Sequence, residues 1–389
     1  MTSIEPVLGL DTAVFEDIVQ TGSPQARQAL AAELAGMTVN PDTAPGERNQ
    51  IVPVLLKLAV DPVAGVRRTL AAGLSAFPEL HPDLLFTIVS DEDDIALPFL
   101  TCTPALNAWQ MVAILRVGDT ARQAIVALRH DITPEAVTFA VNGCNTDVCA
   151  ALLDNPAALL GDEHFQTLYT RFGQMPQIVD RLLARHDLPL DIRIMQAKRT
   201  SNRMHQLMAE KGWVAANDAA EFVADAEETT VLRILVEASE PELQRTIRFL
   251  TAKHMLTPSI ILRAACLGEM RVVERALAHL ADVPLSRARQ MIYGVGLNNI
   301  KTLHAKAGLP QPCLGLLRAA AEVETGVREE GFSIDAGSFG RRLIETLMTR
   351  VEGSSAQERA KHLEFIGRFA EDRVRVIAKR LKADLMRAA

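Results

Sequence analysis

Four related phrases place histidine where it could do chemistry. Each runs from a basic or His-containing helix end through a short apolar turn to a proline, at residues 129–134, 185–189, 253–258 and 279–284. Histidine titrates near neutral pH and binds metals, so each phrase could supply an acid–base group or a ligand. A catalytic group has no reason to recur from repeat to repeat, whereas a cation suits a helix C-terminus and a proline suits the first turn of the next helix. We therefore interpret the phrases as repeated helix junctions.

Two other clusters could bind a metal. The acidic run Asp91-Glu92-Asp93-Asp94 could hold a divalent cation, but Pro98 and apolar residues follow it, where a calcium-binding loop needs further ligands spaced through about twelve residues. We expect a solvated turn that caps the next helix. Cys144 and Cys149 lie close together, yet no second Cys or His pair completes a zinc pattern. The sequence predicts neither a metal nor another cofactor.

The familiar catalytic motifs are missing from the sequence. It has no phosphate-binding loop, no dinucleotide-binding glycine fingerprint after a strand, no His-Glu-x-x-His and no Gly-x-Ser-x-Gly. Gly294-Val295-Gly296 is interpreted as a helix break. We predict that the protein is not an enzyme, although a site assembled from distant residues would leave little trace in a sequence.

The composition favours helices. Of the 389 residues, 48% are hydrophobic but only 4% are aromatic, so the core must be made of Leu, Ala, Val and Ile. That argues against a β-sandwich or barrel, which relies on aromatic and β-branched strands. The net charge of −7 gives no overall affinity for nucleic acid. Five scattered cysteines, an odd number, indicate buried thiols in a reducing cytosol.

One uncharged stretch has the length of a membrane span. It runs from Ala96 to Leu115 and contains Pro98 and Pro104, which would break a helix in lipid. We expect two short buried helices with a turn near Thr103. Because the N-terminus also lacks the pattern of a signal peptide, the sequence predicts a soluble, cytoplasmic protein.

Helical periodicity runs through nearly the whole chain after Thr12, in segments of about ten to fifteen residues with short breaks. A second repeated phrase begins at Asp61-Pro62-Val63-Ala64-Gly65-Val66-Arg67-Arg68. In this phrase Asp61 could cap a helix whose buried stripe contains Val66, Leu70 and Leu74. Degenerate copies stand at residues 93–96 and 145–150.

The second phrase resembles the second helix of a HEAT repeat, because Asp61 precedes Val66-Arg67 and an Ala/Leu helix. The resemblance implies a polar ladder between the Asp and Arg of adjacent repeats. The next two copies have Ala96 and Cys149 in place of the Arg, so we expect an irregular array. The order of the stretches 61–74, 95–115, 124–155 and 256–310 also resembles a bacterial family known as domain of unknown function 2336. That resemblance implies an all-helical, HEAT-like protein and transfers no catalytic residue.

We therefore predict an all-α fold, an irregular HEAT-like α-solenoid of stacked helical hairpins with a C-terminal helical extension. Turn-forming residues at 41–47, 212–218 and 331–340 suggest the boundaries, with the last as the linker. The predicted parts are N-terminal helices and a loop at 1–48, HEAT-like repeats at 49–211, a second repeat subdomain at 219–330 and basic amphipathic helices at 341–389.

The C-terminal part is basic on an acidic body. Residues 341–389 hold 12 Lys+Arg and 7 Asp+Glu, a charge of +5, which leaves −12 for residues 1–340. Apolar residues in steps of three and four predict one stripe of a long helix: Leu363, Ile366, Ala370, Val374, Ile377, Leu381 and Leu385. We expect this helix to cover the open end of the array. A partner or homodimer helix and a membrane-surface helix are the alternatives.

The functional prediction is a non-enzymatic scaffold that binds an unknown protein partner, with a regulatory role left open. The alternative is a HEAT-like protein that binds nucleic acid through basic residues on one face, against which the overall acidity argues. Trp109 is expected in the core, and Trp213, in a polar turn, is the better candidate for exposure. The candidate interaction residues are Arg67, Arg68, Trp213, Arg373, Arg375, Lys379 and Arg380.

Overall fold

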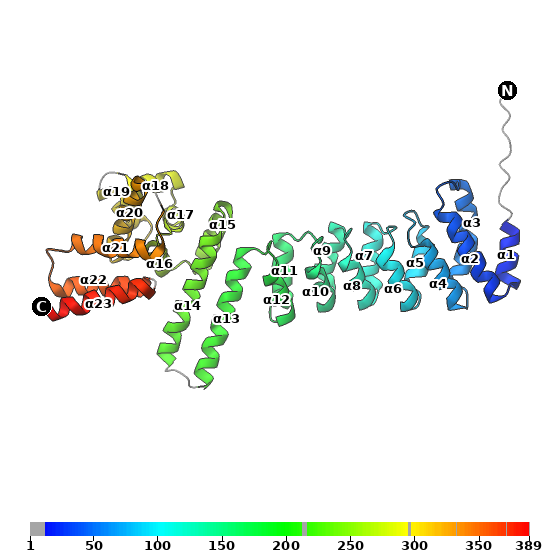
Figure 1. Cartoon of the computed structure of the whole chain (residues 1–389), viewed down its shortest axis with the longest axis horizontal. Coiled ribbons are helices and arrows are strands. Elements are labelled where there is room, and N and C mark those ends of the chain that lie inside the picture. Colours follow the sequence, from blue (N-terminus) through cyan, green and yellow to red (C-terminus); the bar gives the residue numbers. More distant parts are fainter. Residues whose placement is uncertain (1–11, 212–215, 295–296, 332, 371, 389) are drawn as a thin grey trace, which may run out of the picture. The chain divides into compact units, whose positions relative to one another are not determined.

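A computed structural model describes residues 12–211, 216–294, 297–331, 333–370 and 372–388, and all regular secondary structure in these ranges is helical (Figure 1). This confirms the predicted all-α class. The chain forms two compact units, Met1–Leu188 and Pro189–Ala389. The division comes before the predicted boundary at 212–218, because the helices on either side of that segment, α13 (Leu190–Lys211) and α14 (Ala216–Glu237), pack against each other.

The first unit consists of short helices that stack in chain order. Each even-numbered helix from α2 to α12 packs on the next even-numbered one, and α7, α9 and α11 pack on each other in the same way, so from α5 to α12 Figure 1 shows two rows. The helices are α1 (Thr12–Thr21), α2 (Pro24–Val39), α3 (Pro45–Ala59), α4 (Ala64–Leu74), α5 (Pro82–Val89), α6 (Asp93–Cys102), α7 (Ala108–Val117), α8 (Thr120–Leu128), α9 (Pro134–Gly143), α10 (Thr146–Asp154), α11 (Asp162–Phe172) and α12 (Pro176–Ala184).

Small residues let these helices approach closely. A Cβ on Gly73 of α4 would stand 2.6 Å from the Cβ of Ala35 on α2, so only glycine fits there. The uncharged stretch 96–115 forms parts of α6 and α7 with a turn between them, as predicted. None of the described helices combines the length and apolar character that a bilayer span requires.

Arginines join successive hairpins of the first unit. Arg129, directly after α8, donates to the carbonyl oxygens of Leu100 and Thr103 at 2.6 and 2.7 Å, and to the Asp131 carboxylate at 2.8 Å. Arg185, after α12, likewise donates to the carbonyls of Leu153, Asn155 and Ala158, at the end of α10 and just beyond it. All four repeated phrases lie at helix junctions. In the first two the arginine satisfies carbonyls of the neighbouring hairpin, while His130 and His186 are exposed.

A partial Asp–Arg ladder is also present. Asp61 does not cap α4, whose N-cap is Val63; it accepts instead from Arg27 Nε at 2.6 Å and from the Val63 N–H at 2.8 Å. Arg67 repeats the arrangement one hairpin later by donating to Asp91 at 2.8 Å. The acidic run at 91–94 leads into the next helix, α6, but Glu92 at its N-cap makes no side-chain capping hydrogen bond. The Asp91 side chain is only 9% exposed rather than solvated, because it pairs with Arg67.

The second unit begins as a stack and then folds back on itself. Its helices are α13, α14, α15 (Glu240–Ala252), α16 (Pro258–Leu267), α17 (Met270–Leu280), α18 (Leu285–Tyr293), α19 (Leu297–Lys306), α20 (Cys313–Glu330), α21 (Ala336–Arg350), α22 (Ala356–Phe369) and α23 (Asp372–Ala388). Residues 260–266 of α16 are all buried, because α14, α17, α20, α21 and α22 surround this helix. A predominantly apolar helix is expected at such a central position, and its one charged residue, Arg263, is paired.

The C-terminal region differs from its prediction in two ways. The apolar stripe from Leu363 to Leu385 lies on two helices, α22 and α23, because the first helix ends at Phe369, with Ala370 as its C-cap, and the two helices pack as a hairpin. The predicted linker is also wrong in part. Gly331 does end α20 in the left-handed conformation, with a φ of 75°, but Gly340 is buried inside α21.

Candidate interaction groove

The two arginines predicted in the first unit have different environments. The Arg67 side chain is only 13% exposed and pairs with Asp91 and Glu92, so it holds hairpins together. The hydrogen bond to Asp91 raises the pKa of Arg67. Arg68 is half-exposed and pairs with Asp94 on the surface. Neither guanidinium is without a partner.

The exposure of the two tryptophans was predicted from their sequence surroundings. The prediction that Trp109 lies in the core is wrong: it is 55% exposed, and its ring packs at 5.4 Å from that of Phe86 on α5. An uncharged stretch indicated burial, but one face of α7 remains uncovered. Trp213 lies outside the described residues.

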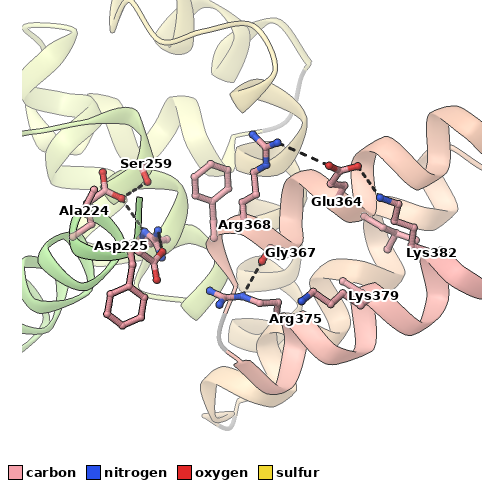
Figure 2. Close-up of a pocket in the computed structure, with 15 residues that line it drawn as sticks. Ala224, Asp225, Ser259, Glu364, Gly367, Arg368, Arg375, Lys379 and Lys382 are labelled. Atoms are coloured by element: carbon pink, nitrogen blue, oxygen red, sulfur yellow. Dashed lines mark hydrogen bonds and ion pairs between the residues drawn. The ribbon is translucent and has the colours of Figure 1, made fainter. Parts of the chain in front are cut away.

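The basic residues of α23 point to a groove within the second unit. Arg375 and Lys379 line an open cavity of about 780 Å³, whereas Arg373 and Arg380 are exposed elsewhere on the same helix. Helices α14 and α16 form one wall of this groove, and α22 and α23 form the other (Figure 2). The lining residues are Phe222, Ala224, Asp225, Glu228, Ser259, Arg263, Leu363, Glu364, Gly367, Arg368, Phe369, Arg375, Ala378, Lys379 and Lys382.

The α14–α16 wall contains a satisfied polar network. Arg263, only 9% exposed on the central helix α16, donates to Glu228 at 3.0 Å and also pairs with Asp225. Glu228 further accepts from the hydroxyls of Thr257, at 2.8 Å, and of Ser259. Buried charges are stable only when paired and hydrogen-bonded in this way. The network fixes this wall: Glu228 has three internal partners, and Asp225 pairs with Arg263.

The α22–α23 wall has fewer internal partners for its cations. Lys382 donates to Glu364 at 2.8 Å, and this hydrogen bond lowers the pKa of Glu364. Arg368 is 70% exposed and reaches Glu364 only at 3.9 Å. Arg375 donates to the Gly367 carbonyl at 3.0 Å and so covers the C-terminus of α22. These contacts orient the two helices and keep their basic groups at the groove.

Lys379 is the exception in this groove. It is exposed, and within the described ranges it has no hydrogen bond or ion pair, in contrast to Lys382 one turn away (Figure 2). Across from it, on α14, the Phe222 side chain is 66% exposed. Five cations and three carboxylates line the groove, which therefore carries net positive charge on an acidic protein.

Sequence reasoning found only Arg375 and Lys379 of these groove residues. It missed Phe222, Arg263 and Arg368, which come from three other helices. An arginine within the apolar run of α16 and a phenylalanine within the acidic start of α14 were the available signals. Among the described residues there is no group of His, Cys, Asp and Glu that could hold a metal ion.

Comparison with known proteins places the chain without assigning an activity. No curated protein matches it, and no solved structure does. A family model described as an uncharacterised protein conserved in bacteria matches residues 95–357, which include the α14–α16 wall of the groove and end before Leu363. Because this match covers more than half of the sequence, the chain belongs to that bacterial family, domain of unknown function 2336.

Proposed function

We propose that this protein is a non-enzymatic helical-repeat scaffold that binds a protein partner in the groove of its second unit. The observation that carries the proposal is that an ammonium with no partner among the described residues, that of Lys379, and the exposed ring of Phe222 line opposite walls of one open groove whose other polar groups are mostly satisfied. A groove that offers both a basic group and apolar surface is a common arrangement for recognising a protein segment. We place this interaction in the cytoplasm.

The chemistry of the groove supports binding rather than catalysis. A general acid or base needs a group free to exchange a proton with a substrate. Glu228 accepts hydrogen bonds from Arg263, Thr257 and Ser259, and Glu364 accepts one from Lys382. These two carboxylates already have internal partners, and the third carboxylate of the groove, Asp225, pairs with Arg263.

The nucleic-acid alternative has less support. Of the candidate arginines, Arg67 pairs with Asp91 at 2.8 Å and Arg68 pairs with Asp94, so these guanidinium groups already have carboxylate partners. In the groove itself, Asp225, Glu228 and Glu364 offset three of the five cations and so weaken its attraction for a phosphate backbone.

The experiment compares partner capture by three forms of the full-length protein. The wild type, Lys379→Glu and Arg380→Glu are immobilised and exposed to native bacterial lysate, and recovered proteins are quantified by mass spectrometry. Arg380 is the matched control, because it is the next residue on α23 and does not line the groove. Circular dichroism and thermal unfolding establish that both variants are folded.

The proposal expects at least one protein that the wild type and Arg380→Glu recover and Lys379→Glu loses. The same set of proteins with all three forms would contradict it, as would recovery of nucleic acid alone. Size-exclusion chromatography of the three forms tests the homodimer alternative, which predicts a Lys379-dependent shift in mass with no other protein present.

A further inference from the structure

We infer that the occupant of the groove is an amphipathic helix with an apolar stripe and a few carboxylates beside it. This inference rests on the proposed function and names the chemistry of the partner. It is drawn from the charged and apolar groups on the two walls that have no partner, or only a weak one, among the described residues.

The charged groups that are unpaired or weakly paired are cations on α22 and α23. Lys379 has no partner in the described part of the chain, and Arg368 has only a long contact to Glu364 at 3.9 Å. In contrast, Arg263 is held by two carboxylates on the opposite wall. A ligand carboxylate would therefore pair with Lys379 and Arg368 without breaking an existing buried pair.

The most exposed apolar side chain of the groove lies on α14. Phe222 exposes two thirds of its side chain, and Phe369 across the groove is half-buried, with its ring at 5.2 Å from that of Phe365. Burying apolar surface contributes about 25 cal/mol per Å², so a Leu or Phe of the partner would gain most by packing on Phe222.

The walls also decide the backbone form of the partner. Both are made of helices whose backbone groups bond within the helix, so they offer no free strand edge to an extended peptide. A helix instead lays one face into a groove between helices. A volume of about 780 Å³ suits the few anchoring side chains of such a helix.

The charge of the whole chain limits the partner's acidity. With a net charge of −7, the protein repels a polyanion at a distance, and inside the groove Asp225, Glu228 and Glu364 offset three of the five cations. A helix can place its carboxylates on the Lys379 side only, whereas the phosphates of DNA or RNA run along the entire strand. The groove thus favours a moderately acidic helix over nucleic acid.

The test uses a labelled synthetic helical peptide of about 18 residues, or five turns, and fluorescence anisotropy with the full chain. One peptide has Leu on one stripe and Glu beside it; two others replace every Glu by Gln or by Lys. We expect the Glu peptide to bind wild type about three- to tenfold more tightly than the Gln peptide, as one or two exposed ion pairs allow.

The protein variants separate the contribution of charge to peptide binding from that of apolar contact. Lys379→Glu should reverse the preference, so that the Lys peptide binds better than the Glu peptide, while Arg380→Glu should retain the wild-type order. Phe222→Ala should weaken all three peptides alike. Lys379→Met provides a milder variant that removes the preference without adding a like charge.

Equal affinity of the Glu and Gln peptides for wild type would overturn the inference, as would tighter binding of a single-stranded DNA of similar length. If lysate capture depends on Lys379 but the Glu peptide shows no preference, the scaffold function stands and the acidic-helix inference falls. If the Glu peptide binds with the expected order but no protein is captured, the chemistry of the groove stands and the proposed function falls.

Discussion

Gly340 lies against Val374 so closely that a Cβ on the glycine would stand 2.6 Å from the Val374 Cγ2 atom. Gly340 is buried within α21, and Val374 is buried on α23, the helix that presents Arg375 and Lys379 to the groove. The contact therefore fixes the position of one groove wall. A glycine that suggested a linker in the sequence is in fact a packing residue.

The first prediction is that Gly340→Ala destabilises the protein. Replacing glycine by alanine inside a helix normally stabilises by about 0.5–1 kcal/mol, but forcing an atom into a packed contact costs about 1–3 kcal/mol. The Val374 side chain branches at Cβ and cannot move aside easily. We expect a lower Tm and weaker binding of the Glu peptide.

Gly326 provides the matched control. It lies inside α20, where an added Cβ would meet nothing within 4 Å, so Gly326→Ala should leave the Tm unchanged or raise it. Equal effects of the two substitutions on Tm would contradict the role of Gly340 in close packing against Val374.

The second prediction concerns the junction arginines. Arg129→Met should remove the hydrogen bonds to the carbonyls of Leu100 and Thr103 and leave these buried acceptors unsatisfied. Losing a buried bond to a charged donor costs about 1.5–3 kcal/mol. Urea unfolding should show a fall in the free energy of unfolding of that order or larger.

Arg68→Met serves for comparison, since Arg68 forms an exposed ion pair with Asp94. Exposed pairs contribute about 0–1 kcal/mol. If Arg129→Met unfolds at the same urea concentration as Arg68→Met, the arginine junctions do not hold the hairpins together.

The stacked helices of the first unit were predictable because their signals are local. Period-3.6 apolar residues and a proline at the start of helices such as α9 and α12 appear directly in the sequence. The phrase at residues 129–134 marks a junction in the structure as it did in the sequence. What the phrase could not reveal is that Arg129 satisfies carbonyls near residue 100, because that partner is set by how the hairpins stack.

The groove was only half predictable, because its walls come from four helices distant in sequence. The basic residues of α23 were visible, but the partner wall exists only because α16 is central and α22 folds back onto it. The same tertiary effect divides the apolar stripe into two helices at Ala370. Trp109 shows the opposite error: it lies in an uncharged stretch of sequence, which predicted burial, but its side chain is exposed in the structure.

The third prediction is an acid dependence of stability at the junctions. The hydrogen bond from Arg185 lowers the pKa of Asp187 below its ordinary value of 3.8. Burial raises the pKa of Asp131, but the hydrogen bond and charge of Arg129, together with a backbone hydrogen bond, outweigh this effect, so the pKa of Asp131 is also lowered. A depressed carboxyl pKa stabilises the folded state above the unfolded pKa, and that stability is lost as the pH falls through the folded pKa.

The double variant Asp131→Asn/Asp187→Asn should therefore be less stable than wild type at pH 7. The difference should shrink as the pH falls below about 3.8, the ordinary aspartate value, because wild type then loses the same charges. Urea titrations across this pH range measure it. A difference that stays constant down to the acid limit would contradict the role of these two carboxylates.

The fourth prediction corrects the expectation that all five thiols are buried. Cys102, at the end of α6, is exposed, while Cys144, Cys149, Cys266 and Cys313 are buried. Burial raises the pKa of Cys149 to about 11 and that of Cys266 to about 12, so both remain protonated thiols at neutral pH. Because the thiolate is the reactive form, the lack of reagent access and the lack of ionisation both make Cys149 and Cys266 unreactive in the native protein.

A thiol-reactive chromophore such as dithionitrobenzoate should thus react rapidly with one thiol of the native protein and with all five after unfolding in urea. Cys102→Ser should abolish the rapid phase, whereas Cys313→Ser should leave it unchanged and reduce only the total in urea. Rapid reaction of a second native thiol would mean that one of the helix stacks opens on the timescale of the assay, and the cysteine variant that removes that phase would identify which one.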